Sequence, residues 1–130
     1  MVPVKRFMSV KGIPLSDILT DDKIDKLVER TRHGGAEIVS LLKTASAYYA
    51  PAASSFEMVK AVLKDEKRML PVSAYLDGEY EASDVYVGVP AVIGKDGAER
   101  IIDVKLDADE SKSLRHSIDS VKSMISKLTI

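Results

Sequence analysis

The longest regular pattern in the chain is a stripe of apolar and small side chains between residues 21 and 43. They recur at steps of three and four, which is the spacing of one face of an α-helix. The members of this stripe are Ile24, Leu27, Val28, Thr31, Gly35, Ile38, Val39 and Leu42. Thr20 precedes it as an expected N-cap, and two aspartates follow in the first turn, where the helix dipole favours negative charge. The pattern predicts one long helix over residues 21–43.

Two adjacent glycines, Gly34 and Gly35, lie inside that predicted helix. Each glycine costs about 1 kcal/mol relative to alanine in a helix interior. The pair indicates a kink, a tolerated weakness, or a close approach of backbone, ligand or partner helix.

Two further segments have helical spacing. Ser46 can cap a helix that has Pro51 near its first turn. The predicted buried face of this helix consists of Ala52, Phe56, Val59 and Leu63. The last helix opens with the acidic segment "DADESKS", which again suits the positive end of the dipole. Its apolar stripe consists of Leu114, Ile118, Val121, Ile125 and Leu128.

Elsewhere the pattern alternates with a period of two, which is typical of strands. "RMLPVSAYL" (68–76) and "DVYVGVPAVIG" (84–94) are predicted strands, and "KDG" (95–97) is a predicted hairpin turn into the strand "ERIIDVKL". Together they predict a three-stranded antiparallel meander. Pro71 and Pro90 should lie at edges, bulges or gaps of the hydrogen-bond ladder.

The N-terminal residues "MVPVKRF" also alternate and predict a first strand that runs on to Val10, followed by a loop with Gly12 and Pro14. The resulting order is strand, two helices, meander and helix. This order predicts an α+β fold, an antiparallel sheet with packed helices. The 130 residues are enough for one domain with a real core.

Composition excludes several classes of function. The chain has 19 basic and 20 acidic residues and a net charge of −1, which argues against a nucleic-acid binder. It has no cysteine, which excludes disulfides and thiolate chemistry. No apolar run reaches the length of a membrane span, and the N-terminus lacks a signal-peptide core. These features predict a soluble cytoplasmic protein with no membrane partner.

The two histidines, His33 and His116, are the natural candidates for acid–base chemistry. On the predicted helices both lie on the polar side, and His33 is about 180° from the centre of the apolar face. A solvated or interface histidine is therefore favoured over a catalytic base. Neither histidine has the spacing of a zinc site, and no nucleophile elbow or phosphate-binding loop occurs. The residues alone indicate a soluble α+β domain without its own active site.

Three strings of the sequence closely resemble the C-terminal half of NAD-dependent malate dehydrogenases of the lactate-dehydrogenase-like bacterial type. These strings are "ERTRHGGAEIVSLLKTASAYYAPAAS", "KRMLPVSAYLDGEY" and "DVYVGVPAVIGKDGAERIIDVKL". The resemblance covers essentially the whole chain in order. It implies that residues 1–130 are a single C-terminal, substrate-side domain. His33 departs from the family, which tends to carry asparagine there.

The resemblance also concerns the start of the chain. In the family, the catalytic histidine lies in a Gly-Gly-His-Gly-Asp segment that is followed by a Met-Val-Pro strand, and this chain starts with Met-Val-Pro. We therefore expect a fragment that begins just after the catalytic histidine, with the N-terminal Rossmann NAD-binding domain absent. The arginines that hold the substrate and the aspartate that orients the histidine would be absent too. The resemblance thus implies no catalytic residue in this chain.

In the complete enzyme, the resemblance implies hydride transfer between malate and NAD to give oxaloacetate, a reaction of the tricarboxylic acid cycle, without a metal. It implies a homo-oligomer, either a dimer or a tetramer. The residues expected in the wall of the substrate pocket are Ser46, Ala47, Gly35 and Ala36. The residues expected at a subunit interface are Arg30, Arg32, His33 and Gly34.

Two alternatives stay open. The first alternative is a free-standing structural or interaction domain without catalysis. The second is part of a lactate dehydrogenase, which stays open because the loop that selects the substrate lies in the absent half. The string "SAYYAPAAS" favours malate. We also expect the first strand and the long helix to leave apolar surface uncovered where a Rossmann half would dock.

Overall fold

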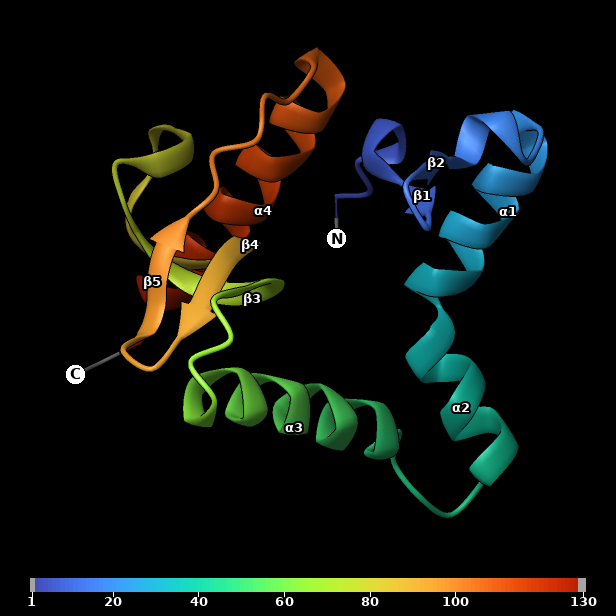
Figure 1. Cartoon of the computed structure of the whole chain (residues 1–130), viewed down its shortest axis with the longest axis horizontal. Coiled ribbons are helices and arrows are strands. Elements are labelled where there is room, and N and C mark those ends of the chain that lie inside the picture. Colours follow the sequence, from blue (N-terminus) through green and yellow to red (C-terminus); the bar gives the residue numbers. More distant parts are fainter. Residues whose placement is uncertain (1, 129–130) are drawn as a thin grey trace. The chain divides into compact units, whose positions relative to one another are not determined.

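The computed structural model describes residues 2–128, and the chain divides into two compact units, Met1–Pro51 and Ala52–Ile130 (Figure 1). The first unit contains, in chain order, the 3-10 turn η1 (Lys5–Phe7), β1 (Ser9–Val10), β2 (Ile13–Pro14), the 3-10 turn η2 (Leu15–Asp17), α1 (Asp21–Arg32) and α2 (Gly34–Leu42). Helix α3 (Tyr49–Leu63) begins at the boundary. The second unit continues with β3 (Arg68–Asp77), the 3-10 turn η3 (Glu79–Glu81), β4 (Ser83–Gly94), β5 (Gly97–Ile101) and α4 (Ala108–Ile125).

The second unit is built on a three-stranded antiparallel sheet with β4 in the centre. Strands β3 and β4 pair from Arg68 opposite Ile93 to Leu76 opposite Val85, and β4 turns into β5 through a two-residue loop that Gly94 and Gly97 close. The predicted meander and its turn are therefore confirmed. The third strand ends at Ile101 and is shorter than its alternating pattern indicated.

The core of the second unit lies on one face of this sheet. Alternate side chains of β3 and β4 are buried there, as the period of two requires. They are Val72, Ala74, Leu76, Val85, Val87, Val89, Ala91 and Ile93. Leu114 and Ile118 of α4 are buried with them, and α4 packs on β4. This arrangement confirms the α+β class with a helix packed on an antiparallel sheet.

Helix α4 begins as its acidic first turn predicts. The Asp107 carboxylate accepts the Glu110 amide hydrogen at 2.9 Å, and the Glu110 carboxylate accepts that of Asp107 at 2.9 Å, which is a complete capping box. Its apolar stripe is buried only in the first half, because Ile125 and Leu128 are exposed. His116 is exposed on the opposite face, as predicted.

Both prolines of the sheet lie at positions where the missing N–H removes little of the hydrogen-bond ladder. Pro71 is in the edge strand β3, directly opposite Pro90 in β4. The Pro90 carbonyl accepts a hydrogen bond from the Ile102 amide at 2.8 Å, but Pro90 has no N–H to return to the Ile102 carbonyl. Both positions agree with the prediction that these prolines lie at edges or ladder gaps.

Tyr80 supplies the donor that Pro90 lacks. Its hydroxyl donates to the Ile102 carbonyl at 2.6 Å and accepts the Val104 amide hydrogen at 3.1 Å. Burial of this hydroxyl raises the pKa of Tyr80 above its ordinary value. Tyr80 holds a left-handed backbone conformation with φ 53° to reach this position. One phenol thus ties the β3–β4 connection to the segment that leads from β5 to α4.

The predicted first strand is wrong over most of its length, and its first residue lies outside the described residues. Residues 5–7 form the turn η1 instead, and the strand is limited to Ser9 and Val10. The chain then reverses tightly at Lys11 and Gly12, which have φ values of 50° and 85°, as in a two-residue hairpin of type I′. The reversal pairs β1 with β2, so the predicted loop contains a strand.

The predicted long helix over residues 21–43 is two helices in the structure. The break falls at His33, whose φ of −98° and ψ of 3° are not helical, and Gly34 starts α2. A kink, one of the interpretations of the glycine pair, is thus confirmed. It lies at His33, one residue before Gly34. Thr20 occupies the N-cap position of α1, although its side chain makes no capping hydrogen bond.

Helix α3 departs from its prediction in its start and in its buried face. It begins at Tyr49 rather than directly after Ser46, with Pro51 in the first turn as expected. The apolar positions predicted to be buried are wrong, because Ala52, Phe56, Val59 and Leu63 are all exposed. The fully buried residue of α3 is Ala61, about 140° around the helix from Phe56. Ala61, with its small side chain, faces inward. The large side chains of Phe56, Val59 and Leu63 are not covered by any described residue.

We expect Tyr80→Phe to lower the free energy of unfolding of the chain by about 1–2 kcal/mol, because the Ile102 carbonyl and the Val104 amide both lose their partner. Urea unfolding followed by circular dichroism measures the change. Tyr86→Phe is the matched control, since the Tyr86 side chain is 62% exposed. Equal effects of the two substitutions would refute the role given to the Tyr80 hydroxyl.

Candidate functional site

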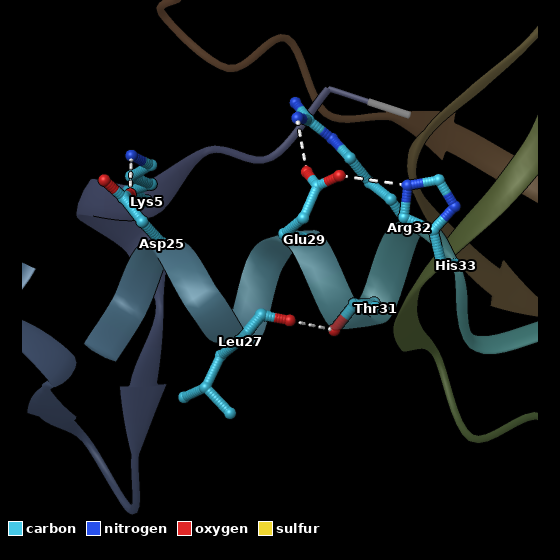
Figure 2. A network of polar contacts seen from close by, with 7 residues as sticks. All are labelled: Lys5, Asp25, Leu27, Glu29, Thr31, Arg32 and His33. Carbon is cyan, nitrogen blue, oxygen red and sulfur yellow. Dashed lines mark hydrogen bonds and ion pairs between the residues drawn. The ribbon is translucent and has the colours of Figure 1, made fainter. Parts of the chain in front are cut away.

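The residues predicted at a subunit interface lie together at the break between α1 and α2. Arg30 and Arg32 end α1, His33 forms the break, and Gly34 opens α2. Figure 2 shows how the Glu29 carboxylate holds two of them: one oxygen lies 2.9 Å from His33 Nε2, and the other lies 3.4 Å from Arg32 Nη1. Lys5 of η1 and Asp25 of α1 form a further ion pair.

A bidentate ion pair spans the break itself. Arg30 donates from Nε to one Glu37 oxygen at 3.1 Å and from Nη2 to the other at 2.8 Å. This forked geometry is the strongest that arginine makes with a carboxylate. The hydrogen bonds and the opposite charge lower the pKa of Glu37 and raise that of Arg30. The pair links α1 to α2 across the residue where the backbone is not helical.

The His33–Glu29 contact is an imidazole–carboxylate pair, which is the arrangement a general base needs. Its environment does not suit catalysis, because the His33 side chain is 71% exposed. A catalytic imidazole works best in a site that excludes water and holds a substrate proton within reach. His33 is therefore a solvated histidine in this structure, as its place on the polar face indicated.

The predicted wall residues lie in the first turn of α2 and in the connection between α2 and α3. Gly35 and Ala36 are in that first turn, whereas Ser46 and Ala47 are in the connection. The helix between them rises about 1.5 Å per residue, so the two pairs are separated along its axis. An added methyl group at Gly34 or Gly35 would meet nothing within 4 Å in the described chain. The structure therefore does not bring the two pairs together, and their role as a pocket wall stays a prediction.

Sequence reasoning missed a polar cluster in the second unit. Lys67 Nζ lies 2.6 Å from both oxygens of Glu99 and 2.9 Å from Asp65 Oδ1, which also accepts the Lys95 amide hydrogen at 2.9 Å. The ammonium group lowers the pKa of Glu99. A Cβ atom at Gly94 would lie 2.3 Å from a Glu99 oxygen, so a larger residue there would displace the Glu99 carboxylate. No spacing signals a contact between residues 32 positions apart; a glycine in a strand pattern was the one hint.

The second unit also has an open groove of about 590 Å³ between η3, residues 103–106 and α4. Tyr80, Leu114 and Ile118 line it, and an ion pair of 2.8 Å between Arg115 and Glu81 lies at its rim. None of the predicted wall residues lines this groove. Across residues 2–128, no helix is long and apolar enough to cross a bilayer.

Comparison with known proteins identifies the family. Residues 1–129 match the sequence pattern of the lactate/malate dehydrogenase α/β C-terminal domain. This chain belongs to that family. The resemblance inferred from the sequence is thereby confirmed, and so is the fold class of this dehydrogenase C-terminal domain.

Individual relatives of the dehydrogenase domain are also similar. A malate dehydrogenase of Rhodopirellula baltica is 53% identical over 128 residues, which are 98% of this chain and 41% of that protein. The structure of malate dehydrogenase from Salinibacter ruber matches with a TM-score of 0.92 and 46% identity, covering 96% of this chain and 41% of that one. Lactate dehydrogenase from Eimeria maxima, with NADH and oxamate, matches with a TM-score of 0.90 and 38% identity over 95% of this chain and 40% of that one. The dehydrogenase domain thus spans about two fifths of the length of these relatives.

We expect Arg30→Met to raise the pKa of Glu37 back towards its ordinary value of 4.5, because the hydrogen bonds that favour the carboxylate are removed. The folded-state pKa lies below the unfolded one, so the pair stabilises the fold above pH 4.5, and this contribution disappears as the pH falls through the folded pKa. An NMR titration of the Glu37 carboxyl carbon measures the shift.

The control for this titration is Lys26→Met, which removes an ion pair of 2.7 Å with Asp22 on the same helix and leaves Arg30 in place. The Glu37 pKa should not change in this variant. An unchanged Glu37 pKa in Arg30→Met as well would show that the pair across the break does not form in solution.

Proposed function

We propose that this chain is the C-terminal, substrate-side part of an NAD-dependent malate dehydrogenase. The whole enzyme interconverts malate and oxaloacetate by hydride transfer to and from NAD. The observation that carries this proposal is the 53% identity to a malate dehydrogenase over 98% of the chain. The structural match to the Salinibacter ruber malate dehydrogenase supports it. NAD is held mainly by an N-terminal Rossmann domain, which also supplies the catalytic histidine and the arginines that hold the substrate.

In this proposal, Gly35, Ala36, Ser46 and Ala47 form one wall of the substrate pocket. None of them carries a charge, and their side chains are among the smallest, so they leave room for a substrate without competing for its carboxylates. Their function is to close the cleft and to exclude water from the reacting atoms. The exposed or half-buried state of all four residues in the described chain supports a surface that another part of the enzyme completes.

Arg30, Arg32, His33 and Gly34 form, in the same proposal, a contact between subunits of a homo-oligomer, a dimer or a tetramer. The Glu29 and Glu37 carboxylates already hold the three charged or polar side chains in place. Side chains that are ordered before association lose less entropy on binding. The enzyme works in the cytoplasm, in the tricarboxylic acid cycle, without a metal, nucleic-acid or membrane partner.

Two other functions compete with this one. The match to Eimeria maxima lactate dehydrogenase supports the hypothesis that this chain is part of a lactate dehydrogenase. Its identity of 38% is lower than the 53% to malate dehydrogenase. A free-standing domain without catalysis is disfavoured by exposed apolar side chains, since Leu41, Phe56 and Leu63 are 74%, 65% and 80% exposed. Such a surface is typical of a segment that another domain covers.

A chimeric enzyme tests the proposal. This chain replaces the corresponding segment of the Rhodopirellula baltica malate dehydrogenase, and oxidation of malate and of lactate is followed by NADH absorbance. We expect the chimera to oxidise malate, because this chain supplies one wall of the pocket, whereas the loop that selects the substrate comes from the Rhodopirellula baltica half. The native Rhodopirellula baltica enzyme is the control. A folded, NAD-binding chimera that prefers lactate would support the lactate dehydrogenase alternative, and one without either activity would support the non-catalytic domain.

The same chimera tests the pocket wall. We expect Ala47→Trp to lower kcat/KM for malate by about ten-fold or more, because a bulky side chain displaces the substrate from its reactive position. Ser123→Trp, on the exposed face of α4, is the matched control and should leave kcat/KM unchanged. A normal kcat/KM in Ala47→Trp would remove Ala47 from the wall.

A further inference from the structure

The groove between η3, residues 103–106 and α4 has an apolar floor, and we call it the α4 groove. Its volume of about 590 Å³ is within the range of sites that bind small molecules. Leu114 and Ile118 line it and are only 8% and 7% exposed. The ring of Tyr80 lines it too, and the Tyr80 hydroxyl already donates one hydrogen bond and accepts another within the chain. The floor therefore offers a ligand mainly apolar contact.

The rim of the α4 groove carries charges of both signs. On α4 they follow one another at steps of four and three, which places them on one face of the helix. The acids and bases that line the groove are equal in number: Glu81, Asp103 and Asp119 against Lys105, Arg115 and Lys122. A ligand with a single charge would meet repulsion as well as attraction along this rim. A ligand that carries one charge of each sign can match it.

The ion pair between Arg115 and Glu81 is accessible to such a ligand. The two side chains are 67% and 82% exposed, and exposed pairs contribute little stability, so a ligand separates them at small cost. Arg115 Nη2 lies 2.8 Å from the Glu81 oxygen, which places the two charges side by side. Neighbouring charges of opposite sign are what an α-amino acid presents, because its ammonium and carboxylate groups are bonded to the same carbon atom.

The backbone of η3 holds Glu81 at the rim in an uncommon conformation. Tyr80 and Glu81 both have left-handed φ values, 53° and 58°, which residues other than glycine seldom adopt. The hydrogen bonds of the Tyr80 hydroxyl to the segment after β5 stabilise this turn. Strained backbone of this kind clusters at functional sites. Here it places a carboxylate opposite the guanidinium group of α4.

We propose that the α4 groove binds a free α-amino acid with a large apolar side chain, such as leucine or phenylalanine. The ligand carboxylate binds the Arg115 guanidinium group, the ligand ammonium group donates to Glu81, and the ligand side chain lies on Leu114 and Ile118. Apolar burial supplies the binding free energy, and the two charges orient the ligand. All of these residues belong to the second unit, and the proposal does not rest on the proposed function.

A series of ligands tests the proposal on the unaltered chain. The backbone amides of the isotope-labelled chain are followed by NMR while L-leucine is added, and we expect shifts at residues 78–82 and 114–122 that saturate at millimolar concentration. Two analogues keep the side chain and lack one charge: 4-methylpentanoate has no ammonium group, and 3-methylbutylamine has no carboxylate. Each is expected to bind about ten-fold more weakly than L-leucine. Free glycine, which has no side chain, should cause no shift.

Two substitutions test the residues at the rim. Arg115→Met and Glu81→Gln are each expected to weaken the binding of L-leucine by about ten-fold, because one of its charges loses its partner. Lys112→Met, on the exposed face of α4 outside the groove, is the matched control and should leave the affinity unchanged. If a variant fails to fold, as judged by circular dichroism, the ligand series still decides.

Three results would overturn the proposal. They are L-leucine shifts that do not reach both η3 and α4, equal affinities for L-leucine and 4-methylpentanoate, and equal affinities of folded Arg115→Met and Lys112→Met for L-leucine.

Discussion

Leu114 and Ile118 of α4 lie against the apolar face of the three-stranded sheet, and without them both faces of that sheet would be in water. Covering the apolar face of a sheet stabilises it, because the apolar area is removed from water. Each large apolar side chain that is buried completely contributes about 1.5–3 kcal/mol, and Leu76 and Val85 at the centre are fully buried. The position of α4 in turn depends on the path of the chain between the end of β5 and the capping box at the start of α4.

That path is controlled by hydrogen bonds rather than by apolar contacts. Pro90 interrupts the ladder at the point where β5 would continue, and the Tyr80 hydroxyl takes over the free carbonyl of Ile102. The same hydroxyl binds Val104, two residues further towards α4. At the opposite end of the sheet, Lys67 joins Glu99 and Asp65 and so ties the β4–β5 turn to the end of α3. The second unit is therefore an apolar core closed at both ends by polar groups.

The first unit has a much smaller apolar core. Ile24 and Val28 are its buried apolar residues among those described, whereas many other apolar side chains of α1 and α2 are exposed. Ion pairs between exposed groups contribute little stability each, so this unit gains most from surfaces that cover it. This physical need agrees with the proposed role in a larger dehydrogenase, where the residues at the α1–α2 break and along α2 face other parts of the enzyme.

The elements that the sequence predicts correctly have a strictly periodic or locally capped pattern. They are the strands β3 and β4, the turn between β4 and β5 and the start of α4, and the sequence strings also identified the family. Alternation and capping act within a few residues, so a short window contains the whole cause. The sequence also showed that His33 lies on a polar face, and its 71% exposed side chain bears this out.

Contacts between distant parts of the chain settle which apolar face of a helix is covered and which polar groups meet. The predicted buried face of α3 is exposed because burial depends on what packs against a helix, and spacing carries no information about a distant partner. The helix break at His33, the pairing of Tyr80 with Ile102 and the convergence of Lys67, Asp65 and Glu99 have the same origin. In each case a contact between groups far apart in the chain, or a backbone angle at one residue, outweighs the local pattern.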